Sequence, residues 1–133
     1  MPLVRISLSS DRPAESRRPI ADAVHRALVK EVGIPEGDRF QIIEVLATDA
    51  MLFDPEYLDV PRQDVVCVQI TLRAGRDAQL KQRLYARIAE EAAAVGVRPQ
   101  DVFVVLTENG SADWSVGNGQ AQLLDEELLA RWR

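Results

Sequence analysis

The amino-acid sequence contains an internal repeat, which constrains the fold more than any other feature. Residues 4–8 (VRISL) match residues 68–72 (VQITL), and residues 32–40 match residues 95–103 at nearly the same offset. A repeat of this length indicates a duplicated supersecondary unit. Each half is therefore expected to contain a strand, a helix, a glycine, a short loop and a second strand.

Two helices are predicted from apolar residues with a period of 3.6. The stripes are Ile20, Val24, Ala27, Leu28 and Val32 in the first half, and Leu80, Leu84, Ile88, Ala92 and Val95 in the second. Gly33 and Gly96 stand where a left-handed C-terminal cap is expected. Pro19 is compatible with the first helix if Ser16 caps it, because the first four N–H groups of a helix have no internal partner.

Four strands are predicted, over residues 3–8, 39–46, 64–72 and 102–107. Parallel strands joined by a helix follow a right-handed crossover. Two such βαβ units side by side give an α+β fold, a tandem βαβ repeat with a four-stranded mixed sheet and two helices on one face. The other face of the sheet is expected to be apolar and bare, which predicts a homo-oligomer that packs through it.

The chain is expected to form one domain, residues 1–133, with repeat halves at about 2–47 and 64–108. The connection over residues 47–63 is long for an unstructured loop. Connections of this length are usually functional or act as a lid. Whether this one closes over a site is left open by the sequence.

The C-terminal extension, residues 109–133, differs in kind from the repeat halves. Glycine-rich turns on both sides of Trp114 predict a short hairpin. Residues 125–132 then predict a short terminal helix. Three apolar side chains of this helix would be available to a neighbouring subunit: Leu128, Leu129 and Trp132.

Composition excludes several classes of function. The net charge of −5 argues against a nucleic-acid surface, which needs clustered basic residues. No apolar stretch approaches the roughly 20 residues that span a bilayer, and the start of the chain does not resemble a secretory signal. The single cysteine, Cys67, has no disulfide partner and no metal-ligand spacing. A cytoplasmic protein without a membrane or nucleic-acid partner is expected.

Pro2 is the first candidate for chemistry, because only Met1 precedes it. Removal of Met1 would leave a secondary amine at the start of a strand. Such a nitrogen can act as acid, base or nucleophile without a side chain. The alternative is that a Met-Pro start is accidental.

Arg73 and Arg76 are the second candidates, at the carboxyl end of the third predicted strand. Ligands of α/β sheets usually bind at such ends, and two guanidinium groups beside a helix start can bind an anion. The alternative is a pair of solvated surface arginines. Asp38 precedes the second strand and is either a turn residue, like its repeat equivalent Asp101, or part of the same site.

Three other residues have simpler interpretations. His25, the only histidine, is expected on the surface of the first helix. Cys67 is expected to be a small buried apolar residue. Trp114 is either a packing anchor or an apolar wall for a substrate.

Three stretches together resemble the tautomerase superfamily, and within it the malonate semialdehyde decarboxylase-like branch. They are residues 33–42 (GIPEGDRFQI), residues 64–66 with Gln69, and residues 112–115 (ADWS) followed by Gly117, Gly119, Ala121 and Gln122. The resemblance extends over almost the whole chain. It implies the tautomerase β-α-β fold, a catalytic N-terminal proline and a homotrimer.

Position by position, the resemblance implies that Pro2 is the catalytic proline and Asp38 the aspartate that works with it. Trp114 corresponds to an apolar residue of the site. Two features depart from the decarboxylase. Arg73 and Arg76 have two residues between them where the decarboxylase has one, and Val116 stands where the decarboxylase has an aromatic residue.

The protonation state of the proline decides which reaction is expected. A low-dielectric pocket and nearby arginines both lower the pKa of an amine. A neutral amine can move a proton beside a carbonyl, which is tautomerisation. A cationic amine would support decarboxylation or hydration, with Asp38 activating a water or holding the ammonium group. In either case Arg73 or Arg76 would bind the substrate carboxylate and stabilise the enolate.

The leading hypothesis is a tautomerase that acts on small 2-keto or enol carboxylates and needs no metal or organic cofactor. Catalytic roles are expected for Pro2, Asp38, Arg73 and Arg76, and substrate contacts for the two arginines, Trp114 and Val116. One alternative is a decarboxylase or hydratase of three-carbon acids. The other is a trimeric ligand-binding domain without turnover.

Overall fold

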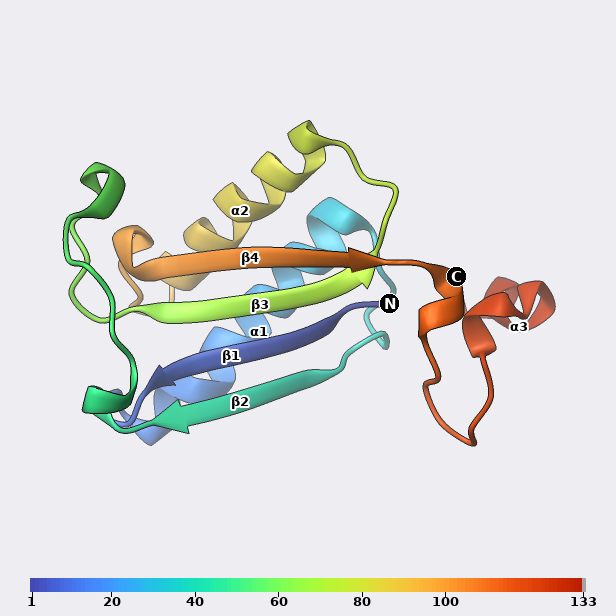
Figure 1. The fold of residues 1–133 in the computed structure, drawn as a ribbon, viewed down its shortest axis with the longest axis horizontal. Helices are drawn as coiled ribbons and strands as arrows, with labels where there is room; N and C mark the ends of the chain where they lie inside the picture. The colour runs from blue at the N-terminus through green and yellow to red at the C-terminus, as the bar shows by residue number, and fades with distance from the viewer. Residues whose placement is uncertain (133) are drawn as a thin grey trace.

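A four-stranded mixed sheet organises residues 1–132, the part of the chain that the computed structural model describes (Figure 1). Its strands are β1 (Leu3–Ser9), β2 (Gln41–Leu46), β3 (Val66–Arg73) and β4 (Val102–Asn109). They lie in the order β2-β1-β3-β4. The outer pairs are parallel and the central pair is antiparallel. The predicted α+β fold of two adjacent βαβ units is therefore confirmed.

Two helices cover one face of the sheet (Figure 1). They are α1 (Arg17–Ala27) and α2 (Ala78–Ala93). The last turn of the first helix widens into a π-helix, Leu28–Val32, which ends at Gly33 with φ of +79°. Gly96, after the second helix, has φ of +92°. Glycine adopts these angles without a steric penalty, so the predicted caps are confirmed. Within residues 1–132 no helix is long and apolar enough to cross a membrane.

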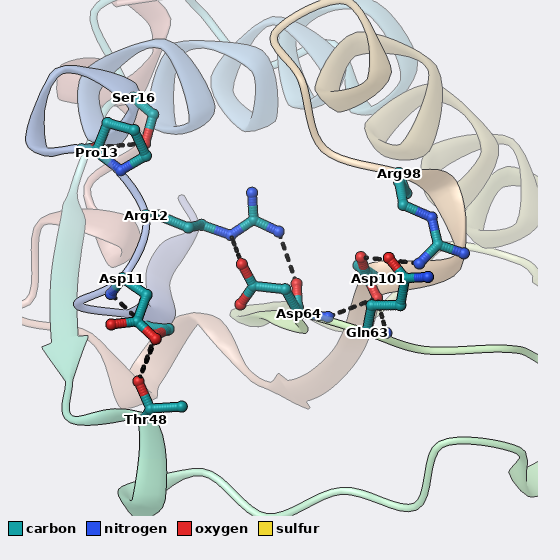
Figure 2. Close-up of polar contacts among 10 residues, drawn as sticks. Asp11, Arg12, Pro13, Ser16, Thr48, Gln63, Asp64, Arg98 and Asp101 are labelled. Carbon is teal, nitrogen blue, oxygen red and sulfur yellow. Dashed lines mark hydrogen bonds and ion pairs between the residues drawn. The ribbon is translucent and has the colours of Figure 1, made fainter.

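The start of α1 differs from the prediction. The hydroxyl of Ser16 donates a hydrogen bond to the carbonyl of Pro13 at 2.6 Å (Figure 2) and accepts none from the helix. Ser16 is therefore not a side-chain cap. Pro19 is nevertheless accommodated, because it is the third residue of α1 and its missing N–H would have no partner in the helix.

The core lies between the sheet and the two helices. Alternate residues of β1 and β3 point to the helices, and the predicted helical stripes meet them. The largest fully buried side chains include Ile6, Leu8, Ile20, Leu28, Ile70, Leu72, Leu84 and Ile88. Each such side chain contributes roughly 1.5–3 kcal/mol when removed from water.

The opposite face of the sheet is uncovered in the single chain, as predicted, but it is not simply apolar. At its centre Arg5 pairs with Glu44 at 3.2 Å, and the hydroxyl of Ser7 donates to Glu44 at 2.8 Å. Exposed apolar side chains lie on the same face: Leu3, Ile42, Phe103 and Val105. The face therefore combines apolar surface with a polar network that joins β1 to β2.

The two ends of the sheet differ (Figure 1). The start of the chain, the carboxyl ends of β3 and β4 and the C-terminal extension lie at one end. The connection over residues 47–63 lies at the other, with short 3₁₀ turns at Thr48–Ala50 and Tyr57–Asp59. Within this chain the connection does not reach the end that carries the N-terminus.

The predicted C-terminal hairpin is wrong, because residues 110–132 contain no strand. The side chain of Gln122 makes backbone hydrogen bonds here, where a second strand was expected to make them. Its amide oxygen accepts the N–H of Val116 at 3.0 Å, and its amide nitrogen donates to the carbonyl of Gly117 at 2.6 Å. The predicted terminal helix is confirmed as α3 (Glu126–Ala130).

Candidate functional site

The start of the chain faces a cavity of about 680 Å³ at the end of the sheet where β3 ends. Its charged lining consists of Asp38, Arg73, Arg76 and the N-terminal residue Met1, and Gln122 is a further polar residue of the wall. Pro2 is buried directly before β1. The strand therefore holds the first residues of the chain in a defined place, and the amine of Met1 marks the chemical environment at that place.

Asp38 is the acidic group nearest to this amine. Its Oδ2 lies 3.4 Å from the nitrogen of Met1. Its Oδ1 is buried and finds no hydrogen-bond partner among residues 1–132. The backbone N–H of Asp38 donates to the carbonyl of Pro35 at 3.0 Å, which closes the turn before β2. One carboxylate oxygen thus faces the amine, and the other is buried without a hydrogen-bond partner in the described part of the chain.

Arg73 and Arg76 both line the cavity despite their unusual spacing. Arg73 ends β3, and Gly75 then adopts φ of +128°, a conformation that only glycine takes readily. This turn lets Nη1 of Arg76 donate to the carbonyl of Arg73 at 2.6 Å. Nη1 of Arg73 donates to the hydroxyl of Ser111 at 3.3 Å. With this turn, both arginines line the same cavity.

The amine of Met1 has a lowered pKa. Burial is the largest cause, because it penalises the charged form. Asp38 acts in the opposite direction by its charge and hydrogen bond, while Arg73 and, after it, Arg76 lower the pKa further. An amine in this place is therefore closer to its neutral form at neutral pH than a free terminus is.

Trp114 and Val116 line an adjoining cavity of about 470 Å³, together with Met1 and Phe40. The indole N–H of Trp114 donates to the side chain of Asn109 at 2.7 Å. Val116 and Phe40 also line the larger cavity. Trp114 is thus both anchored in the structure and part of an apolar wall beside the start of the chain.

The sequence did not indicate the rest of the apolar wall. It comes from the end of α1, the following turn and the C-terminal extension: Val32, Ile34, Leu123, Leu128, Leu129 and Trp132. The last three were expected to contact a neighbouring subunit, and in this chain they line the cavity. The apolar face of the terminal helix was the available signal, but it does not reveal what that face contacts.

Two further expectations were wrong. His25 is not on the surface: it is only 8% exposed, and its Nε2 lies 2.8 Å from the carbonyl oxygen of Glu36. Cys67 is only half-buried, on the uncovered face of the sheet in register with Phe103. Its partial burial, followed by the charge of Glu44, raises the pKa of the thiol.

The repeat equivalent of the amine site lies at the opposite end of the sheet (Figure 1), and Figure 2 shows its polar contacts. There Asp101, which is 2% exposed, accepts the backbone N–H groups of Gln63 at 2.7 Å and Asp64 at 3.1 Å. Arg12 forms an ion pair with Asp64 at 3.3 Å. Both Asp38 and Asp101 thus contact backbone nitrogens of the segment that directly precedes a strand. In the first half the nitrogen is an amine beside a cavity.

Comparison with known proteins shows the family of this chain. Two family models described as "Tautomerase enzyme" match residues 38–117 and 2–61. The probable tautomerase YusQ of Bacillus subtilis (strain 168) is 36% identical over 127 residues, which cover 94% of this chain and 100% of the relative.

Solved structures give the same result. An FG41 malonate semialdehyde decarboxylase inhibited by 3-bromopropiolate is 44% identical, with a TM-score of 0.90 and coverage of 94% of this chain and 96% of that one. A malonate semialdehyde decarboxylase described with decarboxylase and hydratase activities is 30% identical, with a TM-score of 0.87 and coverage of 94% and 98%. A fused 4-OT described as a symmetric trimer shares the fold at 23% identity, with a TM-score of 0.77 and coverage of 93% and 99%.

Proposed function

This chain belongs to the tautomerase family of enzymes, and on that premise we propose that it uses the amine of Pro2 to tautomerise small 2-keto or enol carboxylates. The observation that carries the proposal is the cavity at the start of the chain. There an amine of lowered pKa lies beside one carboxylate and two guanidinium groups. Removal of Met1 would expose the nitrogen of Pro2 to the same surroundings.

The proposed reaction moves one proton and needs no cofactor. Arg73 and Arg76 bind the substrate carboxylate through charge-assisted hydrogen bonds. The neutral amine of Pro2 takes a proton from the enol oxygen or from the carbon beside the carbonyl, and it returns the proton to the other position. The arginines stabilise the negative charge that develops on the enolate oxygen. Asp38 stabilises the transient ammonium group by its charge.

A decarboxylase or hydratase of three-carbon acids is the second candidate, supported by the two decarboxylases that share 44% and 30% identity with this chain. Asp38, which lines the cavity, would activate a water in such a reaction. These reactions would use a cationic amine, whereas burial and the two arginines act against the charged form of the Met1 amine at this place. Val116, in place of an aromatic residue, is a further difference from the decarboxylase pattern. These two differences support tautomerisation as the first proposal.

Two assays on the purified protein separate these functions. We expect the enol form of an arylpyruvate to be ketonised much faster than in buffer, and malonate semialdehyde to release carbon dioxide slowly. Ultraviolet absorbance follows the first reaction, and a coupled carbon dioxide assay follows the second. Fast carbon dioxide release with little ketonisation would replace the proposal with a lyase. Ligand binding without either reaction would indicate a non-catalytic binding domain.

We also infer a homotrimer that packs through the uncovered face of the sheet. The fused 4-OT described as a symmetric trimer supports this assembly, and so do the exposed apolar residues on this face. Analytical ultracentrifugation is expected to give about three times the chain mass of 14.8 kDa. Phe103→Glu should shift the protein toward monomer, because it places a charge on this face. Gln82→Glu, on exposed α2, should leave the mass unchanged; a monomeric wild type would contradict the inference.

A further inference from the structure

The turn that carries Asp38 is attached to α1 on both sides. Before Asp38, the carbonyl oxygen of Glu36 lies 2.8 Å from Nε2 of His25. After it, Nη2 of Arg39 lies 2.6 Å from Oδ1 of Asp22. The acidic group of the proposed site is therefore held between two contacts with the same helix.

The contact of His25 is the more protected of the two. His25 is 8% exposed, whereas the Asp22–Arg39 pair is partly open to solvent. Exposed ion pairs contribute little to stability, while a buried group that loses its hydrogen-bond partner is costly. A carbonyl oxygen only accepts hydrogen bonds, so Nε2 of His25 carries the hydrogen and donates a hydrogen bond to the carbonyl of Glu36.

We propose that His25 is a positioning residue, whose hydrogen bond to Glu36 holds the turn so that Asp38 lies against the N-terminal amine. The contacts of Asp38 itself support this role. Its backbone N–H bonds within the turn, and its Oδ1 has no hydrogen-bond partner among residues 1–132. Apart from the amine, the placement of its carboxylate depends on where the turn sits. The kinetic test of this role rests on the proposed function, whereas the NMR titration of the amine does not depend on it.

Displacement of Asp38 would change the balance of charges around the amine. Asp38 raises the pKa of the amine, while burial and the guanidinium groups of Arg73 and Arg76 lower it. Asp113 lies farther away, on the wall of the adjoining cavity. If the turn loosens, burial and the two arginines still lower the pKa of the amine, while the opposing effect of Asp38 weakens, because charge interactions fall with distance. The pKa of the amine should then decrease.

Three variants test this role. His25→Phe keeps a ring but removes the donor, and His25→Gln places an amide N–H at a similar reach. Arg12→Ala is the control, because it breaks the ion pair with Asp64 at the opposite end of the sheet. The readouts are the pKa of the N-terminal amine from a nitrogen-15 NMR titration, the pH profile of kcat/KM, and the Tm.

We expect His25→Phe to lower the amine pKa by about half a unit to one unit, part of the effect of a nearby opposite charge. Its kcat/KM should fall about tenfold through misplacement of the site. His25→Gln should restore most of both quantities. Arg12→Ala should lower the Tm while the amine pKa stays at the wild-type value.

An unchanged amine pKa in His25→Phe, together with a lowered Tm, would show a structural role only and overturn the proposal. If His25→Phe does not fold, His25→Asn replaces it, because its shorter amide does not reach Glu36. Equal amine pKa values in the Asn and Gln variants would then overturn the proposal. If Pro2→Ala leaves turnover unchanged, the proposed function fails, while the NMR titration still decides the role of His25.

Discussion

Pro2→Ala is expected to slow ketonisation of an arylpyruvate enol by about a hundredfold, within the range that a positioned general base contributes. The substitution replaces the secondary amine of a ring by a primary amine on a freely rotating backbone. Pro2 is buried directly before β1, and Met1, which precedes it, lines the cavity. Initial rates measured under identical conditions for wild type and variant check this result.

A matched variant separates the amine from the rest of the proline. A chain that keeps one residue before Pro2 has an amide there, and an amide nitrogen is not a base. We expect this extended chain to be less active than Pro2→Ala, and intact mass to show that Met1 is absent from the active protein. A fully active chain with Met1 retained would eliminate Pro2 as the base.

The pH dependence follows from the lowered amine pKa. Burial, Arg73 and Arg76 lower the pKa of the Met1 amine, and we expect the same groups to act on the amine of Pro2 once Met1 is removed. Tautomerisation by the neutral amine should give a kcat/KM that rises with pH through this pKa and is then constant. A lyase that needs the cationic amine should show the opposite, with a kcat/KM that falls as pH rises. The pH–rate profile therefore distinguishes the two reactions without knowledge of the natural substrate.

Arg73→Ala is expected to have the second large effect, a loss of roughly 10²–10³ in kcat, comparable to removal of one donor from an oxyanion site. Arg76→Ala should cost less, because its Nη1 donates a short hydrogen bond of 2.6 Å to a backbone carbonyl, whereas Nη1 of Arg73 makes a longer one of 3.3 Å to Ser111. Nε of Arg73 is buried and has no hydrogen-bond partner among residues 1–132. Arg73 also lowers the pKa of the Met1 amine more than Arg76 does. Steady-state kinetics of both variants on one enol substrate check this order.

Lys81→Ala is the matched control for these arginines. Lys81 lies on α2, near the same end of the sheet, and pairs with Glu108 at 2.7 Å without lining the cavity. Its removal changes the net charge as much as removal of an arginine does. We expect nearly wild-type kinetics. A loss equal to that of Arg73→Ala would show that overall charge, rather than direct contact with the substrate, explains the arginine effects.

The elements of the fold were predictable because they depend on local patterns. The repeat of residues 4–8 at 68–72 indicated two copies of one unit, and the helical stripes indicated which residues face the sheet. Gly33 and Gly96 marked the helix ends because a positive φ favours glycine. Ser16 was misjudged because a serine before a helix can bond backward to Pro13 instead of forward.

The site was only partly predictable, because it depends on contacts between distant segments. Arg73 and Arg76 were recognised as a pair, but their convergence depends on the turn at Gly75. His25 looked like a surface residue, because the turn at Glu36 that covers it is not adjacent in the sequence. The predicted hairpin around Trp114 was wrong because side-chain hydrogen bonds from Gln122 to the backbone, and not pairing of two strands, order that segment.

The sequence by itself determined the strands, the helices and the two βαβ halves, because side-chain periodicity and backbone preference act over a few residues. Only the tertiary structure decided that the start of the chain, Asp38 and the two arginines share one cavity, while Asp101 at the corresponding place is buried against backbone N–H groups. The two halves have similar local patterns, so local patterns could not distinguish them. The difference arises where the chain begins: an amine with an adjacent cavity faces Asp38, whereas the backbone N–H groups of a continuous chain face Asp101.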